Sequence, residues 1–112
     1  MAAAGVTPKV TLFQQRVYET LCEVPRGRVT TYGRLARRIG CGSPRAVGGA
    51  LRSNPFAPRV PCHRVIAADG SPGGFQGRTG GAPLRRKLAL LKDEGVTFGS
   101  DGRLCDPGRL WP

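Results

Sequence analysis

The chain has 112 residues, and 18 Lys plus Arg against 7 Asp plus Glu give it a formal charge of +11 at pH 7. This length fits one domain with a modest core, because 39% of the residues are hydrophobic. No apolar run approaches the roughly 20 residues of a membrane helix, and the start MAAAGV has no basic region of a secretory signal. We therefore expect neither a membrane protein, nor a secreted protein, nor a large multi-domain enzyme.

The positive charge is mostly arginine, with fifteen Arg to three Lys. Arginine forms planar, bidentate contacts with phosphate and stacks on bases. A small, basic, Arg-rich domain therefore predicts nucleic acid as its partner. The alternative is a charge that only keeps the protein soluble.

The four cysteines are far apart in the sequence, at Cys22, Cys41, Cys62 and Cys105, and His63 is the only histidine. Zinc sites usually take closely spaced ligand pairs, and disulfide frameworks belong to secreted mini-proteins. We expect no metal, and thiols that are reduced inside the cell. The compartment would be the nucleus in a eukaryote and the cytoplasm in a bacterium.

In chain order, residues 1–10 read as a flexible N-terminus and residues 11–112 as one domain. Apolar residues recur at helical spacing from Leu12, Thr11 is a plausible N-cap, and a Pro-Arg-Gly sequence at 25–27 ends this helix. A short second helix begins after Thr31, and Gly40-Cys-Gly42 ends it.

A third helix is predicted from the cap Ser43 and the first-turn Pro44 to about Ser53. Two short helices separated by a tight glycine turn are typical of a helix-turn-helix. The remaining predicted elements are an extended proline-rich stretch from residue 55, a buried strand at 64–67, a turn at 68–71, a Gly-rich loop at 72–81, a helix at 83–94 and a weak hairpin of 96–98 with 103–105. The expected fold is a small, mainly helical α+β domain with a winged helix-turn-helix-like core.

The third helix contains two interior glycines, Gly48 and Gly49, each of which costs about 1 kcal/mol relative to Ala. Arg45 and Arg52 lie seven residues apart, so they share a face with these glycines. Such a face can lie close to a sugar-phosphate backbone. Close packing against a neighbouring helix is the alternative.

Cys62 is adjacent to His63, which places a thiol beside the only imidazole. A thiol with a pKa near 8.5 needs a base to form the nucleophilic thiolate, and a water can join two side chains that point apart. An imidazole acting as base needs an orienting group, and Glu94 is the best-placed acid. From spacing alone a buried, inert cysteine is an open alternative.

The sequences PCHRV (61–65), TYGRLA (31–36), RAVGGALRSNP (45–55) and KLALLKDEG (87–95) resemble, in this order, motifs of the O6-alkylguanine-DNA alkyltransferases. The resemblance runs from about Phe13 to Phe98. It implies direct, stoichiometric transfer of the alkyl group from O6-alkylguanine in duplex DNA to Cys62, without a cofactor and by a monomer.

The resemblance also implies residue roles. Cys62 attacks the alkyl carbon of a flipped-out base, His63 takes the thiol proton through water, and Glu94 positions His63. Tyr32 crowds the adjacent phosphate and protonates the departing guanine. Asn54 ties the recognition helix to the active-site turn.

On the DNA side, the resemblance implies that the helix-turn-helix binds in the minor groove, with Tyr32 against the phosphate next to the flipped base. From the residues themselves, we expect the face of Gly48 and Gly49 to meet DNA and Arg52 to contact phosphate rather than a base. Arg45 is implied to fill the gap left by the extruded nucleotide. The remaining implied sites are the substrate pocket at Val65, Gly73 and Phe75.

Three features depart from the family pattern. These 112 residues contain no counterpart of the usual N-terminal domain, the Gly-rich loop is longer, and Phe75 replaces a frequent Tyr. The length and the ending Trp111-Pro112 also resemble alkyltransferase-like proteins, which bind alkylated DNA and recruit excision-repair proteins without transfer. The presence of Cys62 favours transfer.

A third hypothesis is a helix-turn-helix regulator that reads base edges in the major groove. We expect Arg64 to be structural, pairing with an acid behind the active-site turn.

Overall fold

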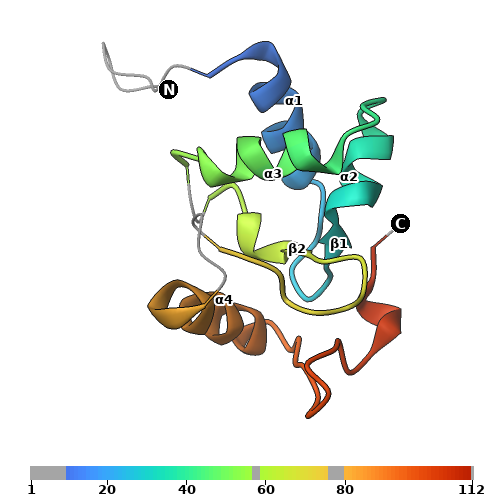
Figure 1. Cartoon of the computed structure of the whole chain (residues 1–112), viewed down its shortest axis with the longest axis vertical. Coiled ribbons are helices and arrows are strands. Elements are labelled where there is room, and N and C mark those ends of the chain that lie inside the picture. Colours follow the sequence, from blue (N-terminus) through green and yellow to red (C-terminus); the bar gives the residue numbers. More distant parts are fainter. Residues whose placement is uncertain (1–9, 57–58, 76–79, 112) are drawn as a thin grey trace.

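The computed structural model describes residues 10–56, 59–75 and 80–111, and its elements are those of a mainly helical α+β domain. Figure 1 shows helices α1 to α3 grouped at one end, helix α4 at the other, and two short strands between them. In chain order the elements are α1 (Leu12–Leu21), β1 (Thr30–Thr31), α2 (Tyr32–Arg38), α3 (Pro44–Arg52), the 3-10 turn η1 (Cys62–Arg64), β2 (Val65–Ile66), α4 (Gly81–Asp93) and the 3-10 turn η2 (Pro107–Arg109).

The predicted N-caps of the first three helices are confirmed. Thr11 accepts a hydrogen bond from the Gln14 backbone, and the Gln14 side chain accepts one from the Thr11 backbone, which forms a capping box. The side chains of Thr31 and Ser43 cap α2 and α3 by accepting from the amides of Arg34 and Ala46, and Pro44 lies in the first turn of α3. The local sequence therefore fixes where each helix of the helix-turn-helix begins.

The core lies where α1, α2 and α3 meet. Val17, Leu21, Leu35 and Val47 are fully buried in it. Each such side chain contributes about 1.5–3 kcal/mol by leaving water. This three-helix core holds α3 by its apolar face, so the opposite face of the helix is free for another partner.

A parallel sheet joins the helix-turn-helix to the segment that carries Cys62. Strands β1 and β2 pair in parallel, with Thr30 opposite Val65 and Thr31 opposite Ile66. This pairing brings the start of α2 next to the end of η1, because β1 leads directly into α2 and η1 leads directly into β2.

The last residues continue this sheet on the other edge of β1. Val29 donates to the carbonyl of Arg109, and Trp111 donates to the carbonyl of Val29. The guanidinium of Arg38 lies 4.1 Å from the centroid of the Trp111 ring, a cation–π contact that fastens this segment to α2.

The structure differs from the sequence predictions in three places. Helix α1 ends at Leu21, before the predicted end at Pro25, and the Val24 amide donates to the carbonyl of Leu21 in the turn that follows. The proline-rich stretch was expected to be extended up to the strand, but Cys62–Arg64 forms a 3-10 turn in which the Arg64 amide donates to the carbonyl of Pro61. Proline lacks a donor but can still supply the acceptor of such a turn. Helix α4 begins at Gly81, two residues before the predicted start.

The predicted hairpin is confirmed as a minimal one, with an antiparallel bridge between Phe98 and Leu104. The predictions for residues 1–9 and for the loop at 76–79 lie outside the described residues. In the part of the chain that the structure describes, no helix is both long and apolar enough to cross a bilayer.

Candidate active site and nucleic-acid face

The 3-10 turn η1 presents Cys62 as a half-buried thiol just before strand β2. The Cys62 amide donates to the carbonyl of Val60, which holds the turn against the end of the proline-rich stretch. Burial raises the pKa of the Cys62 thiol, while a hydrogen bond from Asn54 and the charge of Lys87 oppose this rise. A thiol with a raised pKa is protonated at neutral pH, so nucleophilic chemistry at Cys62 requires a base.

His63 and Glu94 lie in contact, as the sequence predicts. The His63 Nε2 atom is 2.9 Å from the Glu94 Oε2 atom, and their side chains are 4% and 6% exposed. Because a carboxylate can only accept, Nε2 carries the proton and Nδ1 keeps a lone pair in the neutral imidazole. Nδ1 is therefore the atom that can accept a proton from the thiol, through water.

The charges around this pair keep Glu94 ionised and His63 neutral. Burial alone would raise the pKa of Glu94, but hydrogen bonds from Arg64 and His63 lower it to about 2. Burial lowers the pKa of His63. The Glu94 carboxylate opposes this decrease, and the positive charges of Arg64 and Lys87 add to it. A neutral imidazole next to a permanent carboxylate is the state of a working general base.

Asn54 connects the end of α3 to the segment before the thiol. Its Nδ2 atom donates to the carbonyl of Val60, and its Oδ1 atom accepts from the amide of Phe56. Because Val60 also accepts from the Cys62 amide, a single carbonyl joins Asn54 to the turn. The geometry fits the linking role that the family resemblance implies.

Lys87 is a residue of the site that the sequence reasoning missed. Its side chain is fully buried, and Nζ donates to the carbonyls of Val65 and Gly74 at 2.7 and 2.9 Å. Burial lowers the pKa of Lys87 to about 8. The negative charge of a Cys62 thiolate opposes this decrease. The sequence carried a signal, because Lys87 interrupts the apolar stripe of Leu84, Leu88 and Leu91.

Tyr32 lies against Gly73, one of the residues predicted to line the substrate pocket. A Cβ atom placed on Gly73 would be 3.4 Å from the Tyr32 hydroxyl, and Gly73 has a φ of +72°. Burial and the neighbouring Cys62 raise the pKa of Tyr32, so its phenol keeps its proton at neutral pH. Val65 is fully buried and contributes its carbonyl to Lys87, and Phe75 is buried at 7% exposure.

The predicted DNA side of α3 is open. Arg45, Gly49 and Arg52 are exposed and Gly48 is half-buried, while Val47, Ala50 and Leu51 are buried on the opposite side of the helix. A Cβ atom on either glycine would meet nothing within 4 Å. Helix packing within the described chain therefore does not explain the glycines, and we call Arg45, Gly48, Gly49 and Arg52 the glycine face.

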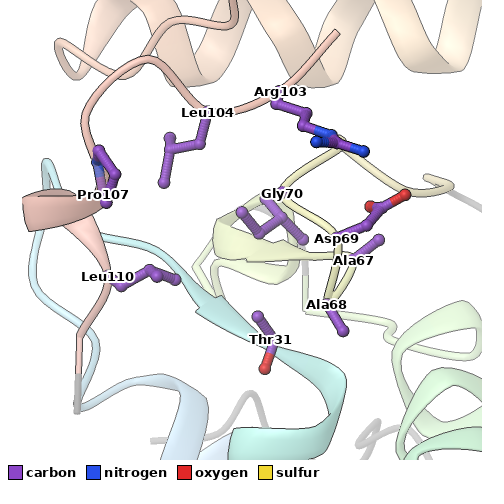
Figure 2. Close-up of a pocket in the computed structure, with 10 residues that line it drawn as sticks. Thr31, Ala67, Ala68, Asp69, Gly70, Arg103, Leu104, Pro107 and Leu110 are labelled. Carbon is purple, nitrogen blue, oxygen red and sulfur yellow. The ribbon is translucent and has the colours of Figure 1, made fainter.

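A separate pocket of about 250 Å³ lies between the turn after β2 and the C-terminal segment. Figure 2 shows Asp69 and Arg103 at its edge, with Leu104, Pro107 and Leu110 on the side of the C-terminal segment. Cys62 is not among the residues that line it. Among the described residues no three His, Cys, Asp or Glu side chains gather in a way that could hold a metal ion.

Comparison with known proteins gives a family match over most of the chain. The family model of the 6-O-methylguanine DNA methyltransferase DNA binding domain matches residues 12–96. This range contains the helix-turn-helix, η1, both strands and α4.

In the curated relatives, about half of the residues aligned with this chain are identical. A methylated-DNA–protein-cysteine methyltransferase of Methanothermobacter thermautotrophicus is 47% identical over 88 residues, which are 79% of this chain and 47% of the relative. A DNA base-flipping protein of Thermus thermophilus is 55% identical over 81 residues, which are 72% of this chain and 51% of the relative. The chain thus spans about half the length of these curated relatives.

The similar solved structures include complexes with DNA. One is S. pombe Atl1 in complex with damaged DNA containing O6-carboxymethylguanine, with a TM-score of 0.77 and 33% identity over 94% of this chain and 99% of that one. Another is Mycobacterium tuberculosis OGT in complex with DNA, with a TM-score of 0.69 and 46% identity over 77% of this chain and 51% of that one.

Proposed function

Because the chain belongs to the family of 6-O-methylguanine DNA methyltransferase DNA-binding domains, we propose that it repairs alkylated guanine by transferring the alkyl group to Cys62. The observation that carries this proposal is the half-buried Cys62 beside a buried His63, whose Nε2 is 2.9 Å from Glu94. The relatives named methylated-DNA–protein-cysteine methyltransferase support the same reaction.

In the proposed reaction the guanine is first rotated out of the duplex, because its O6 substituent cannot meet a protein thiol inside the base stack. The thiol proton passes through water to Nδ1 of His63, and the Cys62 sulfur attacks the alkyl carbon. The bond between that carbon and O6 breaks, and the Tyr32 phenol supplies a proton to the departing guanine. A thioether is a poor leaving group, so each molecule acts once.

The glycine face supports a close approach of DNA. Two arginines flank a helix face without side chains, and such a face permits contact between the helix backbone and a sugar-phosphate chain. We propose that Arg45 enters the space of the flipped base, as the family resemblance implies, and that Arg52 contacts phosphate.

A second candidate function is a lesion sensor that binds alkylated DNA without transfer. The observation that favours it is the match to S. pombe Atl1, which covers 94% of this chain and 99% of that protein. Cys62 distinguishes the two functions, because transfer requires a reactive thiol at this position.

The test is the mass of the Cys62 peptide after the protein meets a duplex with one O6-methylguanine. Transfer adds one methylene to Cys62, and the Cys62→Ala protein gains nothing. A folded protein that leaves Cys62 unmodified, yet binds the lesion duplex more tightly than a matched guanine duplex, contradicts transfer and supports the sensor.

Replacing Gly49 by alanine should separate stability from DNA binding. The new methyl group meets nothing within 4 Å, so helix propensity should raise the free energy of unfolding by up to about 1 kcal/mol. If DNA lies on the glycine face, the same methyl group should weaken duplex binding about tenfold, since this corresponds to about 1.4 kcal/mol of steric loss. Denaturant unfolding and a DNA titration at fixed salt measure both.

The matched control is Ala46→Gly, which removes an exposed methyl group from the first turn of the same helix. A Gly49→Ala protein that is more stable and binds DNA with unchanged affinity would show that DNA does not touch the glycine face.

A further inference from the structure

Arg64 makes more contacts in the site than the proposed reaction uses. Its Nε and Nη2 atoms donate to the two oxygens of Glu94 at 2.9 and 3.0 Å, and Nη1 donates to the carbonyl of Val24 at 2.9 Å. The Arg64 side chain is only 16% exposed. The expected pairing of Arg64 with an acid is confirmed, and the acid is the residue that holds His63.

One carboxylate oxygen is shared by the imidazole and the guanidinium. Glu94 Oε2 lies 2.9 Å from His63 Nε2 and 3.0 Å from Arg64 Nη2. A carboxylate that bonded only to His63 would favour the imidazolium, because an adjacent negative charge stabilises the protonated ring. A bidentate guanidinium on the same carboxylate neutralises much of that charge.

A second guanidinium reaches the carboxylate from the turn after α1. Arg26 Nη1 is 3.9 Å from Glu94 Oε2, and Arg26 Nη2 donates to the carbonyl of Asp93 at 3.0 Å and contacts its carboxylate at 3.2 Å. Arg26 is 62% exposed, so water screens its effect more than that of Arg64.

The other charged or titratable groups that act on His63 in the described chain are few. Lys87 adds positive charge from α4, and Cys62 precedes His63 in η1. Glu94 is therefore the group that favours the imidazolium, Arg64 and Lys87 act against it, and Arg26 can act only through its contact with Glu94.

We propose that Arg64, assisted by Arg26, is a positioning residue that shares Glu94 with His63 and so keeps the imidazole in its neutral, proton-accepting form near pH 7. The inference rests on the proposed function, in which His63 accepts the thiol proton. It assigns a role to the arginine of the PCHR sequence that is separate from holding the turn together.

The experiment uses the fact that His63 is the only histidine. Its ring Hε1 proton, bound to Cε1, gives one NMR signal whose shift with pH reports the imidazole directly, without DNA. The proteins compared at low salt are the wild type, Arg64→Gln, Arg64→Lys, Arg26→Gln and the control Arg103→Gln, which removes an exposed arginine of the C-terminal segment. A parallel assay follows the rate of methyl transfer to Cys62 at several pH values.

The titration midpoint of His63 should move to higher pH in Arg64→Gln and, by less, in Arg26→Gln. It should stay at the wild-type value in Arg64→Lys, which retains the charge, and in Arg103→Gln. Methyl transfer by Arg64→Gln should fall at least about threefold at pH 6 and stay within about twofold of the wild type at pH 9, because only the protonated fraction of the base changes.

An unmoved midpoint in folded Arg64→Gln overturns the proposal, as does a loss of transfer that is equal at all pH values. If Arg64→Gln does not fold, Arg26→Gln decides, and an unmoved midpoint there overturns the proposal. A midpoint that moves as expected, in proteins that never carry a methyl group on Cys62, supports the role of Arg64 and contradicts the proposed function instead.

Discussion

Replacing Glu94 by glutamine is expected to slow methyl transfer to Cys62 about a hundredfold and to lower the free energy of unfolding by about 3 kcal/mol. Glutamine has the shape of glutamate but lacks its charge. The largely buried Arg64 guanidinium, which is 16% exposed and donates twice to Glu94, would lose its counter-ion, and such losses destabilise proteins. His63 would lose the acceptor that fixes the proton on Nε2.

Single-turnover transfer and denaturant unfolding measure the two effects. The matched control is Asp93→Asn, which removes the neighbouring acid, whose side chain is 78% exposed. It should change stability by less than about 1 kcal/mol, as expected for a surface ion pair. Transfer by Glu94→Gln at the wild-type rate would exclude Glu94 from the proposed relay.

The same variant should alter the dependence of stability on acid. The pKa of Glu94 is about 2 in the folded protein against an ordinary 4.5, so its contribution is complete above pH 4.5 and is lost as the pH falls towards 2. The shift corresponds to about 3 kcal/mol by linkage. The stability difference between wild type and Glu94→Gln should therefore shrink between pH 4.5 and 2.

Local features of the chain were predictable because their causes are local. Thr11, Thr31 and Ser43 cap their helices through hydrogen bonds within three residues, and such bonds can be inferred from short sequence patterns. The contact between His63 and Glu94 was predictable for another reason, since only seven acids exist in the chain and Glu94 lies at a helix end.

Features that depend on distant segments were not predictable from the pattern. Strand β2 lies inside the buried strand predicted at 64–67, but β1 has only two residues, too few for a period of two to be visible, and the pairing of the two strands joins residues 35 positions apart. The C-terminal segment completes the sheet through Val29, which no local signal indicates. Arg64 and His63 both contact Glu94 because they lie in the same 3-10 turn. The prolines before this turn predicted an extended chain instead.

Lys87 shows how one polar residue in an apolar stripe can be more informative than the stripe. The spacing of Leu84, Leu88 and Leu91 predicts a buried face, and the structure places Lys87 there at 0% exposure. Lys is almost never fully buried unless its ammonium is paired. Its partners are the carbonyls of Val65, in β2, and Gly74, in the Gly-rich loop, so its position in the site could have been inferred only after the packing of these segments was known.

Replacing Lys87 by methionine is expected to reduce the reactivity of Cys62 about tenfold at pH 7.5 and to destabilise the protein in a pH-dependent way. Lys87 lowers the pKa of the Cys62 thiol, so its removal leaves less thiolate. The carbonyls of Val65 and Gly74 lose their donor, and each unpaired buried carbonyl costs about 1–3 kcal/mol. The rate of alkylation by iodoacetamide and denaturant unfolding measure these effects.

The sign of the pH dependence follows from the depressed pKa. Folded Lys87 has a pKa of about 8 against an ordinary 10.5, so between these values the unfolded chain binds more protons than the folded one. The stability of the wild type relative to Lys87→Met should therefore rise from pH 8 to 10.5, by about 3 kcal/mol. The control Lys92→Met removes an exposed lysine from the same helix and should show no such rise. A constant stability difference across this interval would mean that the ammonium is as well solvated inside the protein as in water, which its two carbonyl contacts alone do not provide.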